Sequence, residues 1–140
     1  MQSVGLSWVQ LSAEQNYAPA MVQLGAITLL GSAGVEKDQQ KAYTDYFAPA
    51  AYAGDQDAQY YIGAAYAGGI AGYKVDPQQA WMWFTLSQQR ALLVKDEEDS
   101  AQAQAGMQEL RATCKAACRT QAKALVRDTI PPAFRHLEEP

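Results

Sequence analysis

An internal repeat constrains the fold of this chain more than any other feature of its sequence. Ten positions between residues 20 and 42 have a counterpart 38 residues later, all in one register. The matched pairs are Ala20 and Ala58, Leu24 and Ile62, Gly25 and Gly63, Thr28 and Tyr66, Gly31 and Gly69, Gly34 and Gly72, Val35 and Tyr73, Asp38 and Asp76, Lys41 and Gln79, and Ala42 and Ala80. The same spacing sets Tyr46 against Phe84. An internal period of this length, built from two helices, is typical of a helical solenoid.

The second copy of the repeat, residues 58–84, indicates how each copy folds. Its first part carries small and apolar residues at helical spacing from Ala58 to Tyr66. The glycines that follow break this stripe, because glycine adopts backbone angles that other residues avoid. Asp76 and Pro77 then begin a second helix, since aspartate is a favourable N-cap and proline is tolerated at the first helical position.

The repeated residues resemble the Sel-one-like (Sel1-like) repeat, a shorter relative of the tetratricopeptide repeat. The shared pattern is Ala-x-x-x-Leu-Gly-x-x-Tyr-x-x-Gly followed by Gly-Val-x-x-Asp-x-x-Lys-Ala, and it covers roughly residues 5–94. The resemblance implies an all-α fold, a right-handed α-solenoid of helix-turn-helix repeats. We expect a single domain over 1–129, divided into a half repeat (5–18), two repeats (19–54 and 55–94) and a C-terminal cap (95–129), with a tail at 130–140.

The first full repeat departs from the family pattern. One residue too many separates Asp38 from Gly54, and Pro49 lies near the end of that helix. Because an interior proline removes a backbone hydrogen bond and clashes with the preceding turn, we expect a kink or bulge near Asp45 to Pro49. Gly25 is expected where two helices approach closely, since a side chain there would hold them apart.

Both ends of the array are expected to be helical. The helix over 5–16 fits the second helix of an incomplete repeat, with Trp8 in the aromatic slot and Leu6, Val9 and Leu11 beside it on the inner side. Residues 98–129 are alanine-rich and cap the solenoid, as one continuous helix or as two helices with a break near Cys118.

Composition excludes several classes of function. The net charge of −4 argues against a nucleic-acid partner, because such proteins usually carry a basic patch. No apolar run reaches the roughly 18–20 residues that a membrane span needs. The N-terminus lacks the basic and apolar segments of a signal peptide. The compartment therefore stays open: cytoplasmic, or periplasmic or secreted if an upstream signal belongs to a longer native chain.

The sequence offers few residues for catalysis, and we expect neither an enzyme nor a cofactor. Cys114 and Cys118 share one helix face, and two buried thiols are favoured over a disulfide or a redox or metal site. His136 stands alone, without a recognisable triad. The acidic run from Asp96 to Asp99 lacks the spacing of a calcium loop, so it fits a solvated helix start better.

Two sets of residues are candidates for a binding surface. Helical spacing places them on the side that the first helices of such repeats present to a concave groove. They are Tyr60, Tyr61 and Ala64 in the second repeat and, at the matching positions one repeat earlier, Val22, Gln23 and Ala26. Exposed tyrosines are common interface anchors, because they are rigid and amphipathic. The alternative is that they pack against a neighbouring turn.

The favoured function is non-catalytic binding of a protein or peptide, as an adaptor or scaffold. Solenoids present extended concave surfaces suited to this role, and the resemblance implies bacterial proteins that mediate protein–protein contacts. Three alternatives remain open. The first is a regulatory or targeting domain of a larger protein. The second is a thiol-redox module that uses the two cysteines, and the third is a homo-oligomer that pairs through its N-terminal half repeat.

Overall fold

The structure, a computed structural model, describes residues 4–15 and 17–129, and it is helical throughout these ranges apart from the turns. The helices are α1 (Val4–Glu14), α2 (Ala18–Leu30), α3 (Gln39–Lys41), the π-helix η1 (Ala42–Phe47), α4 (Ala48–Tyr52), α5 (Gln56–Gly68), α6 (Pro77–Leu93), α7 (Glu97–Leu110) and α8 (Ala116–Thr129). The expected tail and His136 lie outside the described residues.

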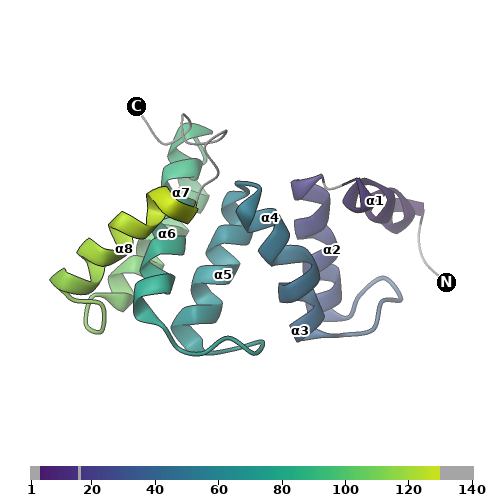
Figure 1. The fold of residues 1–140 in the computed structure, drawn as a ribbon. Helices are drawn as coiled ribbons and strands as arrows, with labels where there is room; N and C mark the ends of the chain where they lie inside the picture. The colour runs from purple at the N-terminus through teal and green to yellow at the C-terminus, as the bar shows by residue number, and fades with distance from the viewer. Residues whose placement is uncertain (1–3, 16, 130–140) are drawn as a thin grey trace.

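The helices follow one another across the molecule as a stack of antiparallel pairs (Figure 1). Helix α2 packs against the continuous segment α3–η1–α4, α5 packs against α6, and α6 is covered by α7 and α8. In this view α2, α5 and α7 lie behind α4, α6 and α8, so the stack has two layers. The architecture confirms the expected all-α helical-repeat solenoid.

The two repeats share one turn conformation between their paired helices. Gly31 and Gly69 end their helices in the left-handed region, with φ of 70° and 65°. Asp38 and Asp76 then cap the following helices, each accepting a hydrogen bond from the backbone N–H three residues later (3.0 and 3.1 Å). The sequence period therefore reflects a repeated backbone, as expected.

Glycine in each first helix lets an aromatic ring of the second helix come close. A Cβ atom at Gly25 would lie 2.6 Å from the Phe47 ring, and one at Gly63 would lie 2.8 Å from the Phe84 ring. The close approach expected at Gly25 is confirmed. Phe47, rather than the aligned Tyr46, is thus the structural counterpart of Phe84.

A π-helix explains why Phe47 takes this position. Residues 42–47 form η1, whose wider turn accommodates the extra residue of the first repeat within the helix. The helix continues without a break into α4, and Pro49, which has no backbone N–H, follows just after the wider turn of η1. The expected bulge is confirmed, and it begins slightly earlier than predicted.

The N-terminal helix differs from the expectation. Leu6 is buried, but Trp8 is 65% exposed and Leu11 is 47% exposed. Helix α1 packs mainly against α2, and residues two apart lie on nearly opposite sides of a helix. With Leu6 facing α2, Trp8 points outward, so the prediction that Trp8 and Leu11 lie on the inner side was wrong.

The C-terminal cap consists of two helices joined by a turn over residues 111–115, just before the break expected near Cys118. Cys114 lies in this turn and forms a disulfide with Cys118, with their Cα atoms 5.1 Å apart. The preference for two free thiols was therefore wrong. The turn releases Cys114 from regular helix geometry, so the disulfide does not have to form within a regular helix.

Candidate functional site

The six candidate binding residues lie on the first helices of the two repeats. Val22, Gln23 and Ala26 are on α2, and Tyr60, Tyr61 and Ala64 are on α5. We call the side of α2 and α5 that carries these six residues the first-helix face. Residues that the 38-residue period aligns therefore lie on corresponding helices of the two repeats.

Tyr60 and Tyr61 are half-buried, and neighbouring rings hold both of them. The Tyr61 ring stacks on Phe47 of η1, with centroids 4.2 Å apart and ring planes within 6°. The Tyr60 ring lies 5.5 Å from Phe84 of α6. Burial, followed by the nearby Asp57 charge, raises the pKa of Tyr61. Packing against neighbouring helices therefore accounts for the inner side of both rings, while part of each stays accessible.

On α2 the candidate residues have a different environment. Gln23 and Ala26 line a cavity of about 310 Å³ together with Leu6 and Val9 of α1. Val22 is half-buried and packs against the core. The structure thus places Gln23 and Ala26 in a cleft between α1 and α2, and the two tyrosines in an aromatic cluster on α5.

Asp57 shares the tyrosine side of α5, because residues three and four apart lie on one helix face. Its pKa is raised to about 7, first by burial, then by a hydrogen bond with Asp99 of α7 and by the charges of Asp99, Asp55 and Asp96. Two carboxyl groups that share a hydrogen bond need a proton between them. Near neutral pH this position therefore changes charge.

A second group of tyrosines was not anticipated from the sequence. Tyr66 and Tyr73 meet edge to face with centroids 4.9 Å apart, and Tyr43 lies 6.2 Å from Tyr73. Burial raises the pKa of Tyr43 to about 12, with further contributions from Tyr61, Tyr73 and Tyr60. No spacing within one segment marks this cluster, because its members come from three separate segments.

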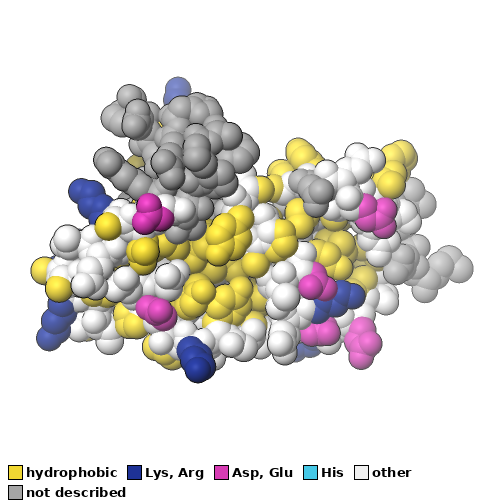
Figure 2. Space-filling view, in the orientation of Figure 1, with side chains coloured by type: hydrophobic (Ala, Val, Ile, Leu, Met, Phe, Trp, Pro, Cys, Tyr) yellow, Lys and Arg dark blue, Asp and Glu magenta, His cyan; other side chains and the backbone are white. Residues whose placement is uncertain are grey.

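The face shown in Figure 2 carries hydrophobic side chains across its middle, over α4, α5 and α6. Tyr52, at the end of α4, is 56% exposed and meets the buried Trp83 ring edge to face at 5.2 Å. No periodic signal marks Tyr52, since it ends its helix outside the repeated positions.

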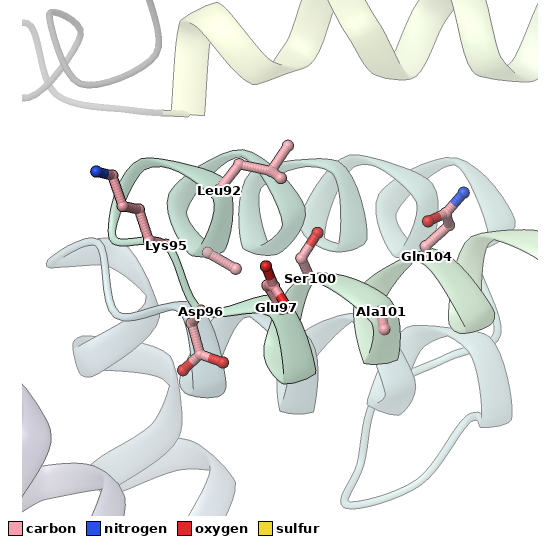
Figure 3. Close-up of a pocket in the computed structure, with 8 residues that line it drawn as sticks. Leu92, Lys95, Asp96, Glu97, Ser100, Ala101 and Gln104 are labelled. Carbon is pink, nitrogen blue, oxygen red and sulfur yellow. The ribbon is translucent and has the colours of Figure 1, made fainter.

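Another hollow lies at the turn between α6 and α7, with a volume of about 400 Å³ (Figure 3). Lys95 and Gln104 lie at its two ends, and Ser100 lies between them. Asp96 borders the hollow, but its carboxylate accepts a hydrogen bond from the Asp99 N–H at 2.9 Å and so caps α7. This supports the interpretation of the acidic run as a helix start.

Within residues 4–15 and 17–129, no three side chains of His, Cys, Asp or Glu are grouped so that they could hold a metal ion. The same ranges contain no helix with both the length and the apolar character to cross a bilayer. With Cys114 and Cys118 joined, neither sulfur is a free thiol for redox or metal chemistry.

Comparison with known families finds two matches to the Sel1 repeat, at residues 18–55 and 56–87. Together these matches span half of the 140 residues. Searches of curated proteins and of solved structures return no match.

Proposed function

Since this chain belongs to the Sel1 repeat family, whose repeats are generally non-catalytic protein-interaction modules, we propose that it is an adaptor or scaffold that binds a protein or peptide on its first-helix face. The observation that carries the proposal is the pair Tyr60 and Tyr61. Each ring packs against a ring of a neighbouring helix and stays partly accessible to solvent.

Fixed aromatic rings suit recognition for an energetic reason. A side chain that is already held in one conformation loses little entropy when a partner covers it. Each ring offers a flat apolar surface and a hydroxyl group, which is the combination enriched at interface hot spots. Ala64, one turn further along α5, is partly buried and adds only a methyl group beside the rings.

The proposal can be tested with a ligand selected from a displayed peptide library. The affinity of the selected peptide is measured by calorimetry for the wild-type chain and for Ala64→Arg, which places a bulky charge beside the rings. Thr44→Arg is the matched control, since Thr44 is exposed on η1. We expect Ala64→Arg to weaken binding at least tenfold and Thr44→Arg to leave it unchanged, with both variants melting near the wild-type temperature.

Labelled Tyr60 and Tyr61 resonances provide the second readout. Peptide binding should shift both of them. A peptide that binds equally well to both variants and leaves these resonances in place would exclude the first-helix face as the site.

A second candidate, self-association through α1, is favoured by the exposure of Trp8 and Leu11. Among the described residues of α1, Glu14 is the one charged side chain, so two copies could meet without strong charge repulsion. Sedimentation equilibrium should then show a dimer that Trp8→Gln with Leu11→Gln converts to monomer. A monomer at every concentration would rule this candidate out.

A further inference from the structure

A cavity of about 400 Å³ lies between α6, α7 and α8, and none of the six first-helix-face residues lines it. Trp81 and Met107 give it an apolar side, while Gln89, Arg119 and Lys123 give it a polar side. This volume is at the lower end of the range for small-ligand sites, so it fits a group about the size of one amino-acid residue.

Two of the residues that line this cavity each carry a buried polar atom with no hydrogen-bond partner in the described part of the structure. Arg119 Nε and Gln89 Oε1 are both buried, the first a donor and the second an acceptor. Buried polar groups in native proteins are almost always paired, because an unpaired one forfeits its hydration without compensation. A donor and an acceptor left unpaired at one cavity indicate a partner that offers an acceptor and a donor in return.

The charged residues at the cavity indicate whether the acceptor group of the ligand is anionic or neutral. Arg119 and Lys123 line it, and none of the described residues in its lining carries a carboxylate. Arg111 also contacts the Trp81 ring, with its guanidinium carbon 5.8 Å from the ring centre, but it does not line the cavity. The nearby Asp128 borders an adjoining depression, which it shares with Lys123. An anionic acceptor is therefore favoured over a neutral one.

Arg119 is oriented for this role by the Trp81 ring, since its guanidinium carbon lies 5.6 Å from the ring centre. Contact with an aromatic face holds the planar guanidinium in place, and a guanidinium held in place can donate two parallel hydrogen bonds to a carboxylate. A compact phosphate would leave the apolar side of the cavity, Trp81 and Met107, without contact.

We propose that this cavity binds a carboxylate that carries a small apolar group and an adjacent N–H or O–H donor. The carboxylate accepts from Arg119 Nε–H, the adjacent donor bonds to Gln89 Oε1, and the apolar group contacts Trp81 and Met107. The C-terminal residue of a peptide has this chemistry, and so does a free N-acyl amino acid. The site is independent of the first-helix face.

The test is a titration of the full chain with N-acetyl-L-leucine at pH 7, followed by NMR of the Arg119 Nε–H and Trp81 indole N–H signals. We expect saturable shifts of both signals, and none with the methyl ester, which lacks the charge. Absence of saturable shifts with the acid, or equal shifts with the ester or with inorganic phosphate, would overturn the proposal.

Four variants test which side chains contribute to the affinity for the ligand. Arg119→Gln and Gln89→Glu should each weaken binding about tenfold to a hundredfold, because one removes the charged donor and the other places a carboxylate in the cavity. Arg111→Gln and Lys115→Gln are the matched controls, since neither residue lines the cavity and Arg111 contacts the same ring as Arg119. Equal affinity across all four variants would place the ligand elsewhere.

A final pair of probes separates the two sources of the carboxylate. A pentapeptide ending in Ala-Leu is compared with its C-terminal amide. Tighter binding of the free-acid peptide than of N-acetyl-L-leucine assigns the site to a protein C-terminus. Weaker binding assigns it to a small free acid. Equal binding of the peptide and its amide contradicts carboxylate recognition altogether.

Discussion

Glycine residues on the first helices determine how closely the layers of this protein approach. Phe84 has glycine on two sides, because a Cβ at Gly63 would lie 2.8 Å from its ring and a Cβ at Gly106 would lie 2.9 Å from it. Real Cβ atoms essentially never come this close to another atom. A methyl group at these positions would therefore have to displace a buried ring in a close-packed interior.

We expect Gly25→Ala to destabilise the protein by about 1–2 kcal/mol, since overpacking costs up to about 3 kcal/mol and the higher helix propensity of alanine offsets roughly 1 kcal/mol of this. Urea unfolding provides the measurement. Gly68→Ala is the control, because a Cβ there meets only Ile70 at 3.8 Å. This control should be neutral or slightly stabilising. A Gly25→Ala variant as stable as Gly68→Ala would contradict the close approach.

Asp57 gives a prediction for pH dependence. Its pKa is raised from 3.8 to about 7 by burial and by the hydrogen bond and charge of Asp99. Between these two pH values the folded chain binds more protons at this position than the unfolded chain does. The contribution of this group to stability is therefore complete below about pH 4 and is lost as the pH rises to 7.

The expected result is that Asp57→Asn raises the melting temperature at pH 8 and leaves it nearly unchanged at pH 4.5. The asparagine amide can donate to Asp99 without any proton uptake. Melting is followed by circular dichroism across this range. Asp45→Asn is the control, because Asp45 is exposed on η1. Identical pH profiles for wild type and Asp57→Asn would mean that the two carboxyl groups share no proton.

At the scale of elements, η1 shows how a helix absorbs an insertion. Its six residues include the exposed Thr44 and the buried Phe47. A π-turn holds one residue more than an α-turn over nearly the same length, so the helix on either side keeps its orientation. The position of the insertion was predictable from residue counts, but the choice between a kink and a π-helix needed the packing of Phe47 against Gly25.

Deleting Thr44 should convert η1 to a regular α-helix and leave a folded protein with a melting temperature within a few degrees of wild type. Deleting Thr85 from the regular helix α6 is the comparison, since it rotates Leu86 and the following residues by about 100° relative to Trp83. That variant should lose cooperative thermal unfolding. If both deletions are equally harmful, η1 has a role beyond accommodating the extra residue.

For the whole molecule, stability rests on neighbours in the stack. Helix α6 contacts α5 on one side and α7 and α8 on the other. Trp81, Trp83 and Phe84 are all less than 10% exposed as a result. In arrays of this kind each repeat is stabilised mainly by its nearest neighbours, and the terminal helices shield the last repeat from solvent.

Removal of α7 and α8 by truncation after Lys95 should therefore expose the aromatic face of α6 and broaden the unfolding transition in urea. Size-exclusion chromatography should show association of the truncated chain. Truncation after Asp128 is the matched control and should behave as the full chain does. A truncated chain that stays monomeric and unfolds cooperatively would show that the two repeats suffice without their cap.

The sequence was most informative where a residue has one dominant local role. Asp38, Asp76 and the turn glycines were predictable, because capping and positive φ depend on the residue itself. The side of α1 that faces α2, the stacking of Tyr61 on Phe47 and the pairing of Asp57 with Asp99 were not. Each of these depends on how two helices are rotated against one another, which no spacing within a single segment determines.

The π-helix also bears on consensus design. A consensus built by aligning the two repeats at a constant 38-residue period would place Tyr46 at the buried aromatic position and move Phe47 toward the surface. Each copy would then place the Tyr46 hydroxyl group in an apolar core and expose the Phe47 ring. A longer array made from this protein should instead be built from the second repeat, whose regular helix α6 needs no insertion to place Phe84.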